Sequence, residues 1–181
     1  MSSANAKTKQ NPQQAPGAQA AADAMKPGPE HAQLAKRVGT WDVSCAMWMK
    51  DGEEPTRSQG TAVLSSLFDG RFLREVFTGQ MGGQPFQGVG TMGFDRVAKE
   101  YVNVWYDSVG TGIIVTRGPA TGDGRELTLS GTFSCPTQGA GVPVRHVYAQ
   151  ESDERFTLTM FQTKDGKDSK SMELAYKRKR D

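Results

Sequence analysis

The sequence predicts an all-β fold, a single antiparallel up-and-down barrel of about ten strands behind a short helix and a disordered N-terminal tail. From residue 39 onward, apolar and polar residues alternate with the period of two that is typical of strands. Turn residues recur about every 8–12 residues, and no helical pattern long enough to join parallel strands lies between the runs. Such a meander closes most simply into a barrel, because closure leaves no exposed edge strand.

Residues 1–28 form the expected tail. They are rich in Ala, Gln, Pro and Ser and contain no aromatic residue. Such a segment cannot bury enough apolar surface to offset the entropy lost on ordering, so we expect it to be disordered. A helix from Gln19 to Met25 is the alternative, because three successive alanines favour it.

A short helix is expected over residues 29–38, directly before the first strand. Pro29 suits the first turn of a helix, and Gly39 suits the position after its last turn. We therefore expect one barrel domain over residues 29–181, with this helix at its start.

The charge balance does not favour nucleic acid as a partner. The chain has 22 Lys and Arg against 20 Asp and Glu, a net charge of +2. Basic residues gather only at Lys177 to Arg180, which we expect to be a solvated end, although such a run can contact phosphates or anionic lipid. There is no run of about 18 apolar residues for a membrane helix, and no secretory signal pattern follows Lys7 and Lys9. We expect a cytoplasmic protein without a membrane partner.

Cys45 and Cys135 are the only cysteines, and they lie far apart. We expect both to be half-buried and unpaired, as is common in a reducing compartment. With two histidines and no cluster at ligand spacing, the sequence predicts no metal site and no bound cofactor.

A short motif, Gly39-Thr40-Trp41, opens the first expected strand. It resembles the G-x-W signature of the calycin barrels, which include lipocalins and fatty-acid-binding proteins. The resemblance implies that Trp41 packs across a closed end of the barrel, beneath a basic residue from a late strand. Lys177 and Arg178 are the two matching candidates.

Five blocks carry a more specific resemblance, which covers about residues 31–180. In this order they resemble the DUF1579 family of uncharacterised bacterial proteins, which implies the fold and no particular activity. The blocks are His31 to Trp48, Gly70 to Leu73, Gly82 to Asp95, Trp105 to Gly112 and Glu173 to Arg178.

The segment from Gly88 to Gly93 matches G-x-G-x-x-G literally. A dinucleotide site needs this motif in a strand-to-helix turn, whereas here the glycines lie inside an expected strand. We interpret them as positions where the strand bends or a neighbouring group approaches closely.

A polar face with one large aromatic ring is the first candidate site. Asn103, Trp105 and Asp107 share one face of a strand, opposite Val102 and Tyr106. If that face points into the barrel, it offers a stacking surface, an amide and a carboxylate to a bound molecule.

Arg71, Glu75 and Phe77 could line the same chamber, or Arg74 in the opposite register. The structural alternative is that Asp107 caps a turn and Arg71 anchors a loop.

His146 shares a face with Val144 and Tyr148 in a late strand. A single His can hold haem, and nitrobindin-type calycin barrels bind haem through one late-strand His, so haem binding through His146 is an alternative function. A satisfied or exposed side chain is the structural alternative for His146 and for His31.

The leading functional prediction is a carrier or sensor that binds one small apolar or amphipathic molecule in the barrel. An enzyme that uses the same cavity, with Asp107 and Arg71 as polar groups, is the second hypothesis. A module that binds another protein through its tail or basic end is the third. Candidate wall or floor aromatics are Trp41, Trp48, Phe77, Trp105 and Phe161.

Overall fold

The computed structural model describes residues 16–50, 52–164 and 166–180. Two helices, α1 (Pro16–Ala24) and α2 (Pro29–Ala35), precede ten strands, which confirms the predicted all-β fold. The strands are β1 (Gly39–Met47), β2 (Thr56–Leu67), β3 (Phe72–Met81), β4 (Gln84–Asp95), β5 (Glu100–Asp107), β6 (Ile114–Pro119), β7 (Glu126–Cys135), β8 (Gly139–Ser152), β9 (Arg155–Lys164) and β10 (Lys167–Arg178).

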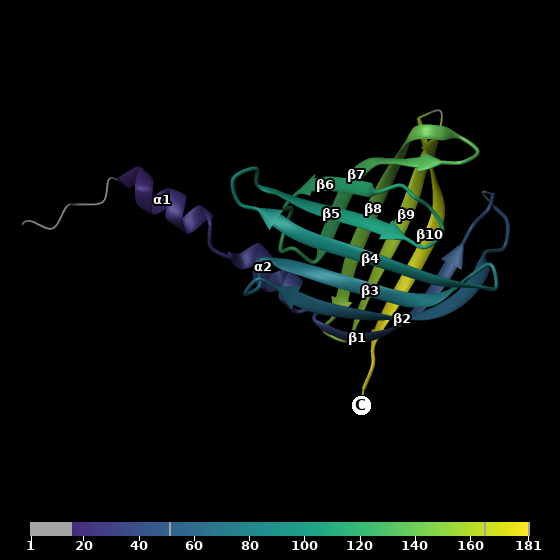
Figure 1. Ribbon diagram of the computed structural model, residues 1–181, viewed down its shortest axis with the longest axis horizontal. Coiled ribbons are helices and arrows are strands. Elements are labelled where there is room, and N and C mark those ends of the chain that lie inside the picture. Colours follow the sequence, from purple (N-terminus) through teal and green to yellow (C-terminus); the bar gives the residue numbers. More distant parts are fainter. Residues whose placement is uncertain (1–15, 51, 165, 181) are drawn as a thin grey trace, which may run out of the picture.

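Each strand pairs antiparallel with the next, and β1 pairs with β10, so the sheet closes into a barrel (Figure 1). Because successive strands run in opposite directions, the turns alternate between the two ends. We call the end that holds α2, the start of β1 and the turns after β2, β4, β6 and β8 the helix end. The other end, with the turns after β1, β3, β5, β7 and β9, is the far end.

The helix end is closed by apolar packing and by one stacked cation. Trp41 is 0% exposed, and its indole Nε1 donates a hydrogen bond of 2.9 Å to the carbonyl of Arg37. The guanidinium carbon of Arg178 lies 4.2 Å from the centre of the Trp41 ring, whereas Lys177 is exposed. Leu34 of α2 packs into the same core. Arg178 therefore takes the position for which the G-x-W resemblance gave two candidates.

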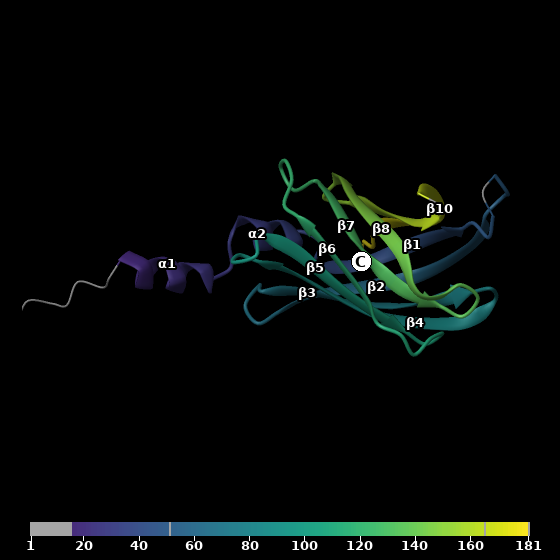
Figure 2. The same ribbon diagram turned by 90° about the horizontal axis from the view of Figure 1, so that it is seen from above.

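Helix α1 lies inside the segment for which we expected disorder, and it overlaps the alternative helix from Gln19 to Met25. The Gln19 amide donates to the Asp23 carboxylate at 3.1 Å, an i,i+4 pair of the kind that supports a helix with few other contacts. The helix projects away from the barrel (Figures 1 and 2). Residues 1–15 of the expected tail lie outside the described residues.

Helix α2 ends at Ala35, before the expected Val38. His31 is buried in it, and its Nδ1 accepts a hydrogen bond of 3.0 Å from the Gly28 amide at the start of the helix. His31 is therefore a satisfied structural residue. The chain turns after α2, and this turn directs Arg37 into the helix end of the barrel.

Candidate functional site

The interior face of the barrel carries four of the predicted site residues. On β3, Glu75 and Phe77 lie on the same face as buried Leu73, and Arg74 lies on the exposed face. On β5, Asn103 is buried and Trp105 packs against the core. The polar-plus-aromatic face of β5 therefore points inward.

Trp105 lies flat against the glycines of the G-x-G-x-x-G segment. A Cβ atom placed on Gly88 would lie 2.2 Å from Cζ2 of the indole, and one on Gly90 would lie 3.0 Å from Cε3. Gly93 faces Phe72 in the same way, at 2.5 Å. The interpretation that a neighbouring group approaches these glycines closely is confirmed, and the motif is part of the barrel wall.

The Asp107 carboxylate accepts hydrogen bonds both from a turn and from the neighbouring indole. Its Oδ1 accepts a hydrogen bond of 3.0 Å from the Val109 amide, and its Oδ2 accepts one of 2.9 Å from Nε1 of Trp105. The expected turn role is present, and the carboxylate also fixes the orientation of Trp105.

Arg71 and Asp107 are not brought together, which corrects the pairing proposed for an enzyme. Arg71 lies in the turn before β3, at the helix end, and donates to the carbonyls of Phe68 at 3.0 Å and Met25 at 3.5 Å. Asp107 ends β5 at the far end, because β5 starts from a helix-end turn and runs away from it. Arg71 anchors a loop and does not line the interior.

Glu75 is the carboxylate of the interior. The Tyr176 hydroxyl donates a hydrogen bond of 2.9 Å to its Oε1, and this bond crosses the barrel because β3 and β10 are separated in the sheet by β2 and β1. Burial raises the pKa of Glu75 to about 7, while the Tyr176 hydrogen bond and the positive charge of Arg37 oppose that rise. By its exposed surface, the Glu75 side chain is only partly buried.

Two further interior side chains have polar atoms without partners. Thr116 is 0% exposed and His146 is 4% exposed, and neither Thr116 Oγ1 nor His146 Nδ1 has a hydrogen-bond partner among the described residues. Burial lowers the pKa of His146 to about 4, so the ring is neutral at pH 7. The sequence analysis did not single out Thr116, although it alternates with inward Ile114 and Gly118 on β6.

Apolar side chains near the far end are only partly buried, although they lie on inward faces and pack against the core. Three of the strands involved, β1, β10 and β9, adjoin one another, since β1 pairs with β10 and Met172 pairs with Met160. The set is Cys45, Met81, Trp105, Met160 and Met172. The interior is therefore less tightly covered near the far end than near Trp41.

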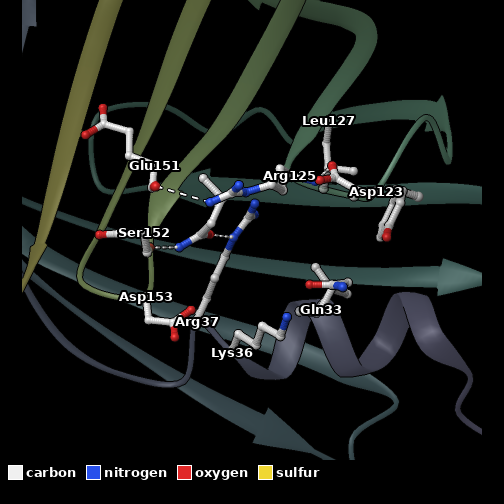
Figure 3. Close-up of a pocket in the computed structure, with 13 residues that line it drawn as sticks. Gln33, Lys36, Arg37, Asp123, Arg125, Leu127, Glu151, Ser152 and Asp153 are labelled. Carbon is white, nitrogen blue, oxygen red and sulfur yellow. Dashed lines mark hydrogen bonds between the residues drawn. The ribbon is translucent and has the colours of Figure 1, made fainter.

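A pocket of about 440 Å³ lies at the helix end, between α2, the β6–β7 turn and the end of β8 (Figure 3). None of the residues predicted for ligand binding lines it. Leu34, Arg37, Tyr101 and Leu127 are its buried lining residues, and sequence reasoning did not group them because no local pattern marks the residues that tertiary packing brings together there.

Among the described residues, no group of three or more His, Cys, Asp or Glu side chains could hold a metal ion. Cys45 and Cys135 are free and half-buried, as expected. In the described part of the chain, no helix has both the length and the apolar character needed to cross a membrane.

Comparisons with known proteins identify a family. No curated protein sequence matches the chain. Among solved structures, the chain is similar to one described as a de novo design of a fluorescence-activating beta barrel, with 14% identity, a TM-score of 0.45, and coverage of 81% of this chain and 96% of that chain. A family model described as "Protein of unknown function (DUF1579)" matches residues 26–178, α2 and all ten strands. The chain therefore belongs to the DUF1579 family.

Proposed function

We propose that this protein binds one small, largely apolar molecule in the barrel interior, as a carrier or sensor. The observation that carries the proposal is the pair of unpartnered atoms, Thr116 Oγ1 and His146 Nδ1, inside the closed sheet. A buried polar group without a partner costs about 1–3 kcal/mol, and a bound molecule that supplies the missing hydrogen bonds removes that cost.

The chemistry around these atoms supports the same proposal. Small-molecule sites combine mostly apolar walls with a few polar groups that orient the ligand. Here Trp105, Met160 and Met172 supply partly buried apolar surface, and Glu75 and His146 supply polar atoms. The partly buried apolar side chains favour entry from the far end.

The enzyme hypothesis has less support, because its two reacting groups, Arg71 and Asp107, lie at opposite ends of the barrel. Haem binding remains a second candidate for one reason, which is that His146 is neutral, buried and unpartnered at Nδ1.

Native mass spectrometry of the purified full chain tests the proposal. We expect a small-molecule adduct in the unmodified protein, or saturable binding of the fluorophore 1-anilinonaphthalene-8-sulfonate with a change in Trp105 fluorescence. His146→Phe should lower the occupancy, whereas Lys177→Met, a change at an exposed strand position, should leave it unchanged. The absence of both the adduct and saturable fluorophore binding would contradict the proposal.

An absorption spectrum addresses the haem candidate in the same preparation. A Soret band that disappears in His146→Phe would assign haem as the ligand. Haem added to the purified protein whose Soret band keeps the position and shape of free haem would eliminate it.

A further inference from the structure

Arg37 is a buried cation that forms no salt bridge within the described residues, although Glu75 acts on it at longer range. It is 4% exposed, and its Nε donates a hydrogen bond of 3.0 Å to Oε1 of Gln150. Its guanidinium carbon lies 5.1 Å from the ring centre of Phe156 and 5.5 Å from that of Tyr148. Among the described residues, Gln150 is its only hydrogen-bond acceptor, and no carboxylate oxygen lies within 4.0 Å of it. A buried charge left in this condition is costly, so a partner is expected.

The guanidinium is held in place from the side of Nε. Gln150 is itself fixed, because its Nε2 donates to the carbonyl of Ser152 at 2.6 Å. Figure 3 shows this chain of hydrogen bonds and the Arg37 side chain rising from the turn after α2. Because Nε is occupied, the two terminal nitrogens of Arg37 are the donors that remain. Together they match the two oxygens of one carboxylate.

The helix-end pocket gives such a partner room. Its volume is about 440 Å³, and Arg37 lines it together with three buried residues, Leu34, Tyr101 and Leu127. These three supply an apolar floor for the body of a bound molecule. The pocket is separate from the interior residues discussed above, since neither Glu75, Thr116 nor His146 lines it.

The charges around the pocket discriminate between anions. Besides Arg37, the lining residues include two cations and three carboxylates. These five are Lys36, Arg125, Asp123, Glu151 and Asp153. The formal charges cancel, so a singly charged ligand gains the contact with Arg37, whereas the carboxylates oppose a second negative charge on the same molecule.

We propose that the helix-end pocket is a second binding site, which takes a small monocarboxylate with an apolar body and holds its carboxylate on the terminal nitrogens of Arg37. The site is separate from the one proposed for the barrel interior, and the two are linked through the electrostatic interaction of Arg37 with Glu75. An anion bound there contacts Arg37 at the helix end of the barrel.

The tryptophans distinguish the two sites. The Trp41 indole donates to the carbonyl of Arg37, so a ligand on Arg37 perturbs the Trp41 N–H, whereas Trp105 lies near the far end. In NMR titrations of the full chain with sodium benzoate, we expect the Trp41 indole signal to shift saturably while the Trp105 signal stays in place. Trp48→Phe and Trp105→Phe assign the signals without altering Trp41.

Two other probes test the charge. Neutral benzamide should bind at least about tenfold more weakly than benzoate, because it loses the charge-assisted contact. Phenyl phosphate at pH 8 should also bind at least about tenfold more weakly, because the carboxylates around the pocket oppose its second negative charge. Equal binding of benzamide would overturn the role of Arg37, and tighter binding of phenyl phosphate would overturn the preference for one charge. These comparisons need no substitution in the pocket.

Arg37→Met tests the residue itself, with Lys167→Met as a control that removes an exposed cation outside the pocket. We expect benzoate affinity to fall at least about tenfold in Arg37→Met and to change less than about threefold in Lys167→Met. Circular dichroism checks that Arg37→Met is folded. If it is not, the titrations of the unmodified protein with benzoate, benzamide and phenyl phosphate still test the proposal. Unchanged affinity in a folded Arg37→Met, or a benzoate shift confined to Trp105, would overturn the proposal.

Discussion

The two ends of the barrel are built differently. At the helix end, Trp41, Tyr101 and Leu127 are fully buried, Leu34 of α2 packs into the core, and Arg178 stacks on the Trp41 ring. At the far end, Trp105 and Met172 keep accessible surface, and in the described part of the chain only turns are found there. The same alternating strands therefore form a closed floor at one end and a looser mouth at the other. If the proposed interior site exists, the far end is the side from which its ligand would enter.

The largest expected effect comes from a matched pair of tryptophans. Trp41→Ala removes a 0% exposed ring and its hydrogen bond, so we expect it to lower the free energy of unfolding by about 3–5 kcal/mol. Trp105→Ala removes a partly buried ring and should cost about 1–3 kcal/mol. Urea unfolding of both variants measures the difference. Equal costs would contradict the comparison of the two ends.

A second pair tests the cation over Trp41. Arg178 donates to the carbonyls of Val38 and Lys36, each at 2.8 Å, and stacks on the indole. We expect Arg178→Met to cost about 2–3 kcal/mol, because it removes charge-assisted hydrogen bonds and a cation–π contact. The neighbouring Lys177→Met should stay within about 0.5 kcal/mol, since Lys177 is exposed. Similar losses in both variants would show that general charge at the C-terminus matters, and not the position of Arg178.

The sequence predicted some features of these two ends and could not predict others. Alternation correctly placed Trp105 and Asn103 on one face, because strand geometry is local and has a period of two. It could not say that this face pointed inward, which depends on closure of the whole sheet. Thr116 could have been found by the same alternation on β6.

Arg71 and Arg37 show where sequence reasoning fails. Arg71 was grouped with Asp107 because both flank strands with candidate inward residues, but the direction of each strand separates them by the length of the barrel. Arg37 follows a helix that was expected to continue through it, so its burial beneath Phe156 and Tyr148 depends on contacts distant in the chain. Long-range packing, and not local pattern, determines both positions.

The pH dependence of stability tests the two interior titrating groups, which act in opposite directions. The pKa of Glu75 rises from 4.5 to about 7, so between these values the folded state binds more protons than the unfolded state, and the contribution of Glu75 is lost as pH rises. The pKa of His146 falls from 6.5 to about 4, so its contribution is lost as pH falls through that range. In the unmodified protein the two slopes largely cancel between pH 4.5 and 6.5.

Removing one group at a time should reveal the other. In Glu75→Gln, we expect stability to rise with pH between about 4 and 6.5, by about 2 kcal/mol more than in the unmodified protein. In His146→Phe, it should fall by a similar amount between about 4.5 and 7. Urea midpoints measured at about pH 4.5, 5.5, 6.5 and 7.5 give both slopes. If the curves of stability against pH are parallel for the three proteins, burial does not shift the pKa of either side chain as described.

The smallest expected effect concerns the far end, where Trp105 lies on Gly88. A Cβ on Gly88 would lie 2.2 Å from the indole, and the hydrogen bond to Asp107 holds that ring in place, so Gly88→Ala must displace it. We expect a loss of about 1–2 kcal/mol and weaker fluorophore binding, because the ring moves into the interior. Gly110→Ala is the matched control, since its nearest neighbour is 3.8 Å away.

A double variant separates crowding from backbone effects at Gly88. If the loss comes from the collision with Trp105, then Gly88→Ala should cost less than about 0.5 kcal/mol in a Trp105→Ala background, and the two changes should be coupled by about 1 kcal/mol. If the loss persists in that background, the glycine is needed for the conformation of β4 itself. In that case contact with Trp105 is not the reason that Gly88 is needed. The measured coupling therefore decides whether the glycines of β4 serve the wall of the proposed interior site or only the bend of the strand.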